Sequence, residues 1–136
     1  IARGVPGLAL SGGLSDDLII GTALDETIYG AQGDDRLKGF AGNDQIWGDA
    51  GDDLIKPGRG QDQLWGGSGS DQFRIRSGDK TIHDFSTQDA DRLIFQSAID
   101  MVRQTSDGVL IDAGKSSALL LGVQRSDLHI SGWLVQ

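Results

Sequence analysis

Carboxylates recur along most of this 136-residue chain at every ninth position. When the sequence is laid out in rows of nine from Gly12, the sixth column is acidic in seven successive rows. These residues are Asp17, Glu26, Asp35, Asp44, Asp53, Asp62 and Asp71. Carboxylate oxygens are hard ligands, so the chemistry that such a column offers is the binding of hard divalent cations.

Two further columns indicate how the chain presents these carboxylates. Glycine permits turns with positive φ, and it fills the fourth column at Gly33, Gly42, Gly51, Gly60, Gly69 and Gly78. The eighth column is apolar in all eight rows, at Ile19, Ile28, Leu37, Ile46, Ile55, Leu64, Phe73 and Ile82. Each row is therefore expected to form a six-residue turn and a short strand whose middle side chain points inward.

One such strand buries too little apolar surface to be stable, but stacked copies bury a continuous column, as in a solenoid. Two rows complete one coil, so odd and even rows build two parallel sheets that face each other. The pattern predicts an all-β fold over residues 12–83. Residues 1–11 are expected to be a linker or N-terminal flank, and residues 84–136 a capping segment.

Stacking creates an electrostatic problem for the sixth column. Successive coils lie about 4.8 Å apart, which places Asp53 above Asp35 on one edge and Asp62 above Asp44 on the other. Such carboxylates repel by roughly 1 kcal/mol per pair in water, and by more when partly buried. Calcium suits oxygen ligands in turns, and about four Ca²⁺ ions would cancel the net charge of -8.

The rows resemble the G-G-x-G-x-D-x-apolar-x pattern of the RTX (repeats-in-toxin, haemolysin-type) calcium-binding nonapeptide repeats. The resemblance implies a right-handed parallel β-roll in which sixth-column aspartates and turn carbonyls hold calcium. The metal-binding positions that it marks are Asp17, Asp35, Asp44, Asp53, Asp62, Asp71, Gly33, Gly42, Gly51, Gly60 and Gly69. It also implies a secreted bacterial protein exported by the type I secretion machinery.

Three rows depart from the pattern. Leu24 and Glu26 in row two, and Ser15 in row one, weaken the gaps that these rows form. Row eight places Lys80 in the carboxylate column, where its ammonium is expected to pair with Asp62 and to end the ion series on that edge. The alternative is that the acidic pairs are ordinary solvated turn residues without a metal.

Composition predicts that calcium and folding are coupled. A chain with 21 Gly and a self-repelling charge has a high ordering cost, so metal binding becomes folding free energy. Extracellular calcium modules bind at about 10⁻⁴ to 10⁻³ M. The chain is therefore expected to stay unfolded inside a bacterium and to fold in the extracellular medium.

The strands also present two distinct outward faces. One carries the cations Arg36, Lys38, Lys56 and Arg74, and the other carries aromatic residues that include Trp47 and Trp65. Repeat modules of this family in mannuronan epimerases attach those enzymes to an acidic polysaccharide, so all six residues are candidates to bind an anionic glycan such as alginate. The alternatives are that the cations offset nearby acid and that the aromatic rings stack to stabilise the sheet.

The C-terminal third resembles the flank that follows such repeats. Strands are expected in ADRLIF, GVLIDA and SALLLGV, with Phe85, Leu93, Phe95 and Leu120 plugging the open end of the roll. The final HISGWLVQ is a candidate for the export signal by resemblance. The chain begins at Ile1, and we expect it to be a fragment of a longer protein.

Several classes of function are disfavoured. The acidic balance argues against nucleic-acid binding, the lack of cysteine excludes disulfides and thiolate metal sites, and no apolar run is long enough to span a membrane. No catalytic motif appears, and His83 and His129 are expected to be surface or packing residues. The chain is therefore interpreted as a non-catalytic calcium module of a larger protein such as a polysaccharide epimerase, lyase, protease or lipase, or alternatively as a purely structural secretion tail of a protease or lipase.

Overall fold

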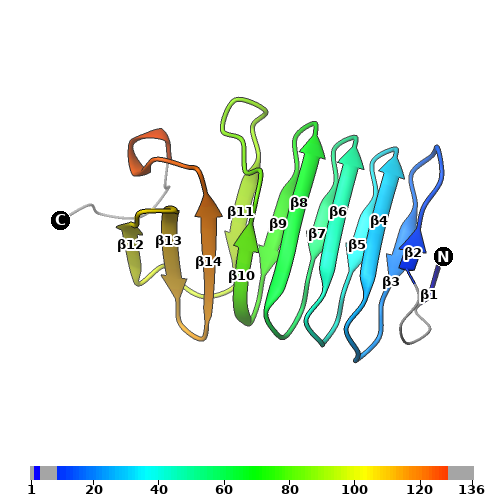
Figure 1. Cartoon of the computed structure of the whole chain (residues 1–136), viewed down its shortest axis with the longest axis horizontal. Helices are drawn as coiled ribbons and strands as arrows, with labels where there is room; N and C mark the ends of the chain where they lie inside the picture. The colour runs from blue at the N-terminus through cyan, green and yellow to red at the C-terminus, as the bar shows by residue number, and fades with distance from the viewer. Residues whose placement is uncertain (1, 4–8, 129–136) are drawn as a thin grey trace.

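The computed structural model describes residues 2–3 and 9–128. Its strands form two sheets that face each other along the axis of a flattened solenoid (Figure 1). The first sheet, which we call sheet A, has the order β1 (Ala2–Arg3), β3 (Leu18–Ile20), β5 (Arg36–Lys38), β7 (Leu54–Lys56), β9 (Gln72–Ile75) and β11 (Arg92–Phe95).

Sheet B continues further towards the C-terminus. Its order is β12 (Met101–Gln104), β13 (Gly108–Ala113), β14 (Ser116–Leu121), β10 (Gly78–Ile82), β8 (Asp62–Ser68), β6 (Gln45–Ala50), β4 (Thr27–Gln32) and β2 (Ala9–Ser11). A single 3₁₀ turn, Arg125–Asp127, follows β14 among the described residues. The predicted parallel β-roll is confirmed.

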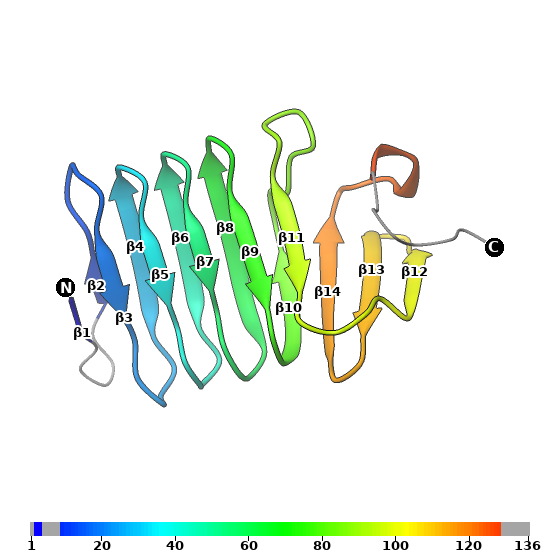
Figure 2. The same ribbon diagram turned by 180° about the vertical axis from the view of Figure 1, so that it is seen from behind.

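The register between coils is the 18-residue step that the sequence predicts. Leu37 pairs with Ile55 in sheet A, and Ile46 pairs with Leu64 in sheet B. Odd rows therefore lie in one sheet and even rows in the other, as Figure 2 shows from the sheet A side. All eight side chains of the apolar column are buried, with at most 1% of their surface exposed.

The roll is longer than residues 12–83. At the N-terminal end, β2 pairs in parallel with β4 and its Leu10 continues the buried column. At the other end, β11 pairs in parallel with β9. The strand in ADRLIF, which the sequence places in the cap, is thus a further strand of sheet A. Both additions bury apolar side chains that would otherwise leave the end coils uncovered.

The cap extends only sheet B. Strand β14 pairs in parallel with β10, while β13 and β12 add antiparallel strands beyond it. Leu120 is fully buried, and Phe85, Leu93 and Phe95 pack half-buried against the core. The sequence did not indicate β12. The proposed export signal, HISGWLVQ, lies outside the described residues. Among the residues that the structure describes, no helix is long and apolar enough to cross a membrane.

Candidate metal centre

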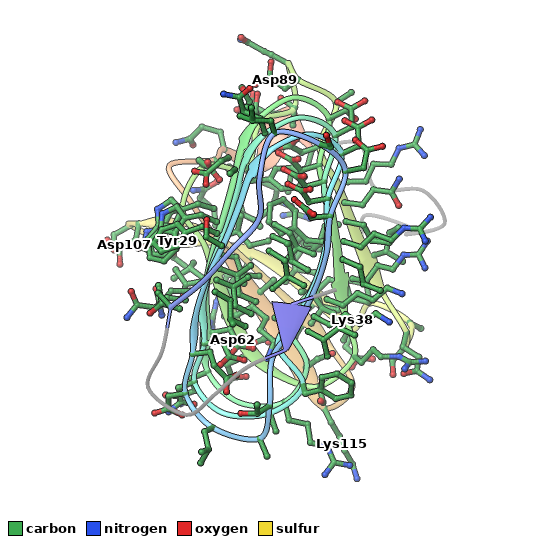
Figure 3. All side chains as sticks on the ribbon, turned by 90° about the vertical axis from the view of Figure 1, so that its right-hand side faces the viewer. Tyr29, Lys38, Asp62, Asp89, Asp107 and Lys115 are labelled. Atoms are coloured by element: carbon green, nitrogen blue, oxygen red, sulfur yellow. The ribbon has the colours of Figure 1, made fainter. Side chains whose placement is uncertain are left out.

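The sixth-column residues lie at the two turn edges of the roll. We call the edge that carries Asp17, Asp35, Asp53 and Asp71 the first edge. The second edge carries Glu26, Asp44, Asp62 and Lys80. Figure 3 looks along the roll and shows oxygen-rich side chains at both ends of the cross-section, near Asp89 and near Asp62.

Backbone hydrogen bonds hold each aspartate of the column in the same orientation. On the first edge, the backbone N–H of Asp35 donates to Asp53 Oδ1 in the next coil at 2.8 Å, and the N–H of Asp53 donates to Asp71 Oδ1 at 2.9 Å. On the second edge, the N–H of Asp44 donates to Asp62 Oδ1 at 2.8 Å. One oxygen of each carboxylate is thus used to join successive coils.

The other carboxylate oxygen, Oδ2, has no hydrogen-bond or ion-pair partner in four of these residues. Oδ2 of Asp35, Asp44, Asp53 and Asp71 is buried and has no hydrogen-bond donor, and at most 2% of each residue is exposed. A buried polar atom without a partner is costly. Its recurrence at one position of the repeat indicates that the turns are shaped for a cation.

Burial changes the protonation of these carboxyls in the absence of metal. Desolvation first, and neighbouring carboxylates to a smaller extent, raise the pKa of Asp44 and of Asp71 to about 7 and that of Asp53 to about 6. The pKa of Asp35 is raised for the same first reason. Each carboxyl therefore favours a bound cation or a proton over an isolated charge at this position.

The first-column glycines leave room beside the unpartnered oxygens. A Cβ placed on Gly30 would lie 2.6 Å from Asp35 Oδ2 and 2.5 Å from the carbonyl oxygen of Gly48 in the next coil. Even one methyl group would therefore clash with oxygens on both sides. The sequence prediction included the fourth-column glycines but omitted this first column, although glycine occupies it in six of the eight rows.

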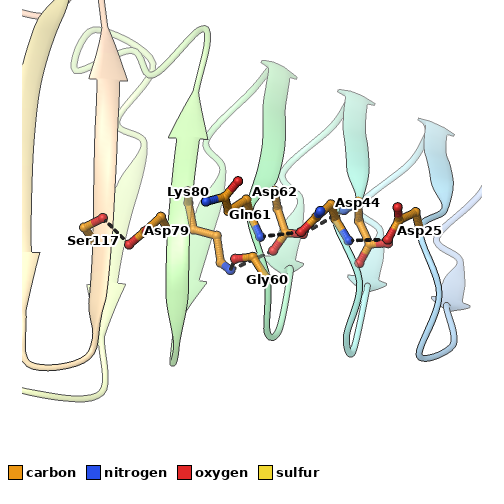
Figure 4. A network of polar contacts seen from close by, with 9 residues as sticks. Asp25, Asp44, Gly60, Gln61, Asp62, Asp79, Lys80 and Ser117 are labelled. Carbon is orange, nitrogen blue, oxygen red and sulfur yellow. Dashed lines mark hydrogen bonds and ion pairs between the residues drawn. The ribbon is translucent and has the colours of Figure 1, made fainter.

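Lys80 shows how a positive charge fits into such a turn (Figure 4). Its Nζ lies 2.7 Å from Asp62 Oδ2 and donates to the carbonyl oxygen of Gly60 at 2.7 Å. Both side chains are fully buried. The predicted pair is confirmed, and the tethered ammonium marks the space between a sixth-column carboxylate and a fourth-column carbonyl as a cation position.

The two acidic residues of the departing rows have different surroundings. Asp17 Oδ2 accepts the backbone N–H of Gly13 at 2.6 Å. Glu26 accepts hydrogen bonds from both the backbone N–H and the hydroxyl of Thr22. Their own turns thus already satisfy these carboxylates, unlike the four described above.

Asp91 continues the first edge but was missed by the sequence analysis. The backbone N–H of Asp71 donates to Asp91 Oδ1 at 2.9 Å, as in the regular rows. Asp91 Oδ2 accepts the N–H of Ser86 at 2.8 Å. The separation from Asp71 is 20 residues instead of 18, so the nine-residue register hides it. The similarity of DRLI at 91–94 to DRLK at 35–38 was the available signal.

A second ladder of side chains runs along the outside of both edges. The fifth-column Asp16 accepts the N–H of Asp34 at 2.9 Å, and Asp34 accepts the N–H of Asp52 at 2.8 Å. On the second edge, Asp25 and Asn43 act in the same way. These residues explain the acidic pairs: the inner aspartate faces the turn interior and the outer one ties neighbouring turns together.

Within residues 9–128, no three acidic or histidine side chains converge closely enough to hold a metal by themselves. A cation at these edges must therefore combine carboxylates of neighbouring coils with backbone carbonyls. That ligand set, hard oxygens from flexible turns, suits calcium.

The cations on sheet A lie on the side opposite Tyr29, where Figure 3 labels Lys38. Arg36, Lys38, Lys56 and Arg74 line one hollow of about 340 Å³ on this face. A larger hollow of about 620 Å³ adds Arg59 and Arg76, which the sequence analysis missed because they lie outside the strand columns. Burial, and then the neighbouring cations, lower the pKa of Lys56.

These cations have no acidic partners. Among the residues that the structure describes, none of these six cations forms an ion pair, in contrast to Lys80, which is paired with Asp62. The chain nevertheless carries 20 acidic against 12 basic residues. The alternative that the cations of sheet A offset nearby acid is therefore not supported by any direct contact.

The aromatic residues of sheet B stack on one another. Ring centroids are 4.9 Å apart for Tyr29 and Trp47, 4.1 Å for Trp47 and Trp65, and 4.2 Å for Trp65 and His83. Both faces of Trp47 and of Trp65 are thus covered by neighbouring rings, which leaves only their edges for a sugar. The geometry favours the alternative in which this ladder stabilises the sheet.

Comparison with known proteins identifies the repeat. The model of the RTX calcium-binding nonapeptide repeat matches residues 20–55 and 58–79. No curated protein sequence matches the chain. Among solved structures, the AlgE6R3 subunit of the Azotobacter vinelandii mannuronan C5-epimerase is 28% identical, with a TM-score of 0.35, over 88% of this chain and 76% of that chain. The extracellular lipase LipA of Serratia marcescens is 13% identical, with a TM-score of 0.48, over 93% of this chain and 40% of that chain.

Proposed function

We propose that calcium ions fill four particular gaps between stacked turns and that their binding folds the chain. The proposal starts from the match of residues 20–55 and 58–79 to RTX calcium-binding nonapeptide repeats, which form a non-catalytic module. The single observation that carries this proposal is the recurrence of a buried, unpartnered Oδ2 at Asp35, Asp44, Asp53 and Asp71.

The position of Lys80 supports a proposal for which gap each unpartnered oxygen faces. Since Lys80 reaches back to Asp62 Oδ2 from the following coil, Oδ2 of each sixth-column aspartate faces the coil that follows it. The proposed calcium gaps are therefore Asp35/Asp53, Asp53/Asp71, Asp71/Asp91 and Asp44/Asp62. Four gaps agree with the number of ions expected from the net charge of -8.

Calcium then supplies the charge that the turns lack. Bringing the carboxylates together without metal costs desolvation and repulsion, and the glycine-rich turns add a large ordering entropy. Binding free energy offsets both, so metal binding and folding occur together. In the low calcium of a bacterial cytosol the chain stays unfolded, and it folds outside the cell after type I export.

A calcium titration tests this coupling. Far-ultraviolet circular dichroism in excess EDTA should show little β-sheet, and millimolar calcium should restore it reversibly. Magnesium at equal concentration is the control, since its smaller, octahedral coordination sphere fits such turns poorly. A roll that is equally ordered in EDTA contradicts the proposal.

The same module is proposed to hold an anionic polysaccharide such as alginate on sheet A. The support is the set of six unpaired cations on that face, because like charges that gather without counter-ions favour an anionic ligand. Arg36, Lys38, Lys56 and Arg74 are the contacts that the sequence already indicated. A structural secretion tail with no ligand other than calcium is the competing function.

Affinity electrophoresis in alginate-containing gels separates these functions. The variant Lys38→Glu/Lys56→Glu should lose its retardation by alginate, whereas Arg103→Glu/Lys115→Glu changes the net charge equally but lies in the cap. Both variants are compared in saturating calcium, with circular dichroism as the measure of folding. If wild-type protein is not retarded, the glycan function is wrong and the structural tail is favoured.

A further inference from the structure

Phe40 occupies a place in the repeat where the fold gives no reason for an aromatic residue. It is the second residue of its row, with φ of 76° and 56% of its surface exposed. The equivalent residues of the next three rows, Asp49, Gly58 and Gly67, have φ of 75°, 92° and 92°, so this position is left-handed whichever residue occupies it. A bulky side chain in this left-handed region is strained, and such strain is found at functional positions.

The surroundings of Phe40 are basic on one side. It lines the hollow of about 620 Å³ on sheet A together with Lys38, Lys56, Arg59, Arg74 and Arg76. Among the residues that the structure describes, no acidic side chain lines this hollow. On its other side, Phe40 and Arg59 border a second hollow of about 680 Å³. The ring of Phe40 therefore lies between the two hollows, and Arg59 lines both of them.

The ring of Phe40 is also available to a ligand. In the described part of the chain it stacks on no other aromatic ring, in contrast to Trp47 and Trp65, both of whose faces are covered. Exposed aromatic faces bind the apolar C–H face of a flat or chair-shaped ring, and nearby cations hold the acidic substituents of the same ligand.

We infer that Phe40 is the stacking platform of a saccharide subsite, on which one sugar ring of an acidic oligosaccharide lies while Arg59 and Lys56 hold its carboxylates. This inference rests on the proposed polysaccharide function and adds a requirement to it. The ligand must carry rings next to its charges, so a linear polyanion without rings uses only the cations.

The strain at Phe40 makes a sharp test possible. Phe40→Gly removes the ring and relieves the backbone, so the variant should be at least as stable as the wild type. Its affinity for short oligomannuronate should nevertheless fall about five- to tenfold. Its affinity for linear polyphosphate of equal charge should not change. Titration calorimetry in saturating calcium measures both ligands.

Ala31→Gly is the matched control. Ala31 is the second residue of the preceding row, with φ of 79°, but it lies on the first edge, away from the basic hollow. This variant should gain stability in the same way and keep wild-type affinity for both ligands. Phe40→Tyr, which keeps a ring, should bind oligomannuronate like the wild type.

Each outcome has one meaning. If Phe40→Gly binds oligomannuronate as tightly as the wild type, the stacking subsite is wrong, while the polysaccharide function stands provided that Lys38→Glu/Lys56→Glu loses binding. Equal losses for oligomannuronate and polyphosphate also overturn the subsite, since the ring then has no specific role. If the wild type binds neither polyanion, both the function and the subsite are wrong.

Discussion

The two turn edges of this roll are built from the same repeat but neutralise their carboxylates differently. On the first edge, Asp35, Asp53 and Asp71 each keep a buried oxygen without a partner. On the second edge, the last aspartate, Asp62, is paired with the ammonium of Lys80. One edge therefore needs an external cation in successive gaps, whereas the other ends its series with a cation that the chain supplies itself.

The repeat therefore specifies a charged space and not a particular occupant. A lysine side chain and a calcium ion both satisfy a carboxylate and a turn carbonyl, because each places positive charge between them. The dependence on calcium differs: a tethered ammonium is present at every calcium concentration, whereas under the proposed function the first edge closes only when calcium is available.

The largest expected effect comes from the middle of the first edge. Asp53→Asn weakens both gaps that Asp53 borders, so the calcium stoichiometry should fall by up to two. At calcium 100-fold above the dissociation constant, about 2.7 kcal/mol is lost for each site removed, or about 5 kcal/mol in total. Titration calorimetry and urea unfolding at fixed calcium measure these quantities.

Asp17→Asn is the control for that variant. The carboxylate of Asp17 is already satisfied by the N–H of Gly13, and it borders none of the four proposed gaps. The calcium stoichiometry of Asp17→Asn should match that of the wild type. Equal losses from the two variants would mean that the unpartnered oxygens do not identify the occupied gaps.

Lys80→Met tests the ion pair that ends the carboxylate series on the second edge. Removing the ammonium leaves the Asp62 carboxylate buried and unpaired, which costs about 3–5 kcal/mol. Unfolding in saturating calcium should show this loss with no change in calcium stoichiometry. Lys80→Asp should instead recover stability and bind one more ion. A lower stoichiometry for Lys80→Met would show that the ions of this edge depend on the lysine.

Acid should partly replace calcium, with a smaller effect. The pKa values of Asp44 and Asp71, about 7, and of Asp53, about 6, lie above the 3.8 of an unperturbed aspartate. The folded chain without metal thus binds more protons than the unfolded chain between these values, and its stability rises as the pH falls from 7 towards 4. The gain is smaller than that from calcium because a proton neutralises one carboxyl but joins no ligands of neighbouring coils.

Circular dichroism in EDTA, followed from pH 7.5 to pH 4, measures this effect. With calcium present the sign should reverse, since protons then compete with the metal for the same oxygens. A calcium-free chain that gains no β-sheet on acidification would contradict the raised pKa values.

The stacked fold was predictable because every row repeats the same glycine, carboxylate and apolar positions. The buried column from Ile19 to Ile82, the parallel sheets and the Lys80–Asp62 pair all follow from register. The prediction failed where the register shifts: the two-residue insertion before Asp91 hid the Asp71/Asp91 gap of the first edge and the last strand of sheet A.

Other features depend on contacts that a row cannot specify. Arg59 and Arg76 lie in turns and at a strand end, and only the stacking of coils brings them into one hollow with Lys56. Likewise, the column containing Trp47 and Trp65 predicts aromatic side chains on one face but not that their rings cover each other.

The coil, the buried column and the alignment of carboxylates follow from the sequence alone, because a fixed nine-residue period makes each of these a local property repeated along the chain. Which carboxylate oxygens remain without a partner, and which cations are left unpaired, depends on how the coils stack. Those properties depend on the few ångströms between neighbouring coils, where a glycine hydrogen, a lysine ammonium or an inserted loop changes what an oxygen can contact.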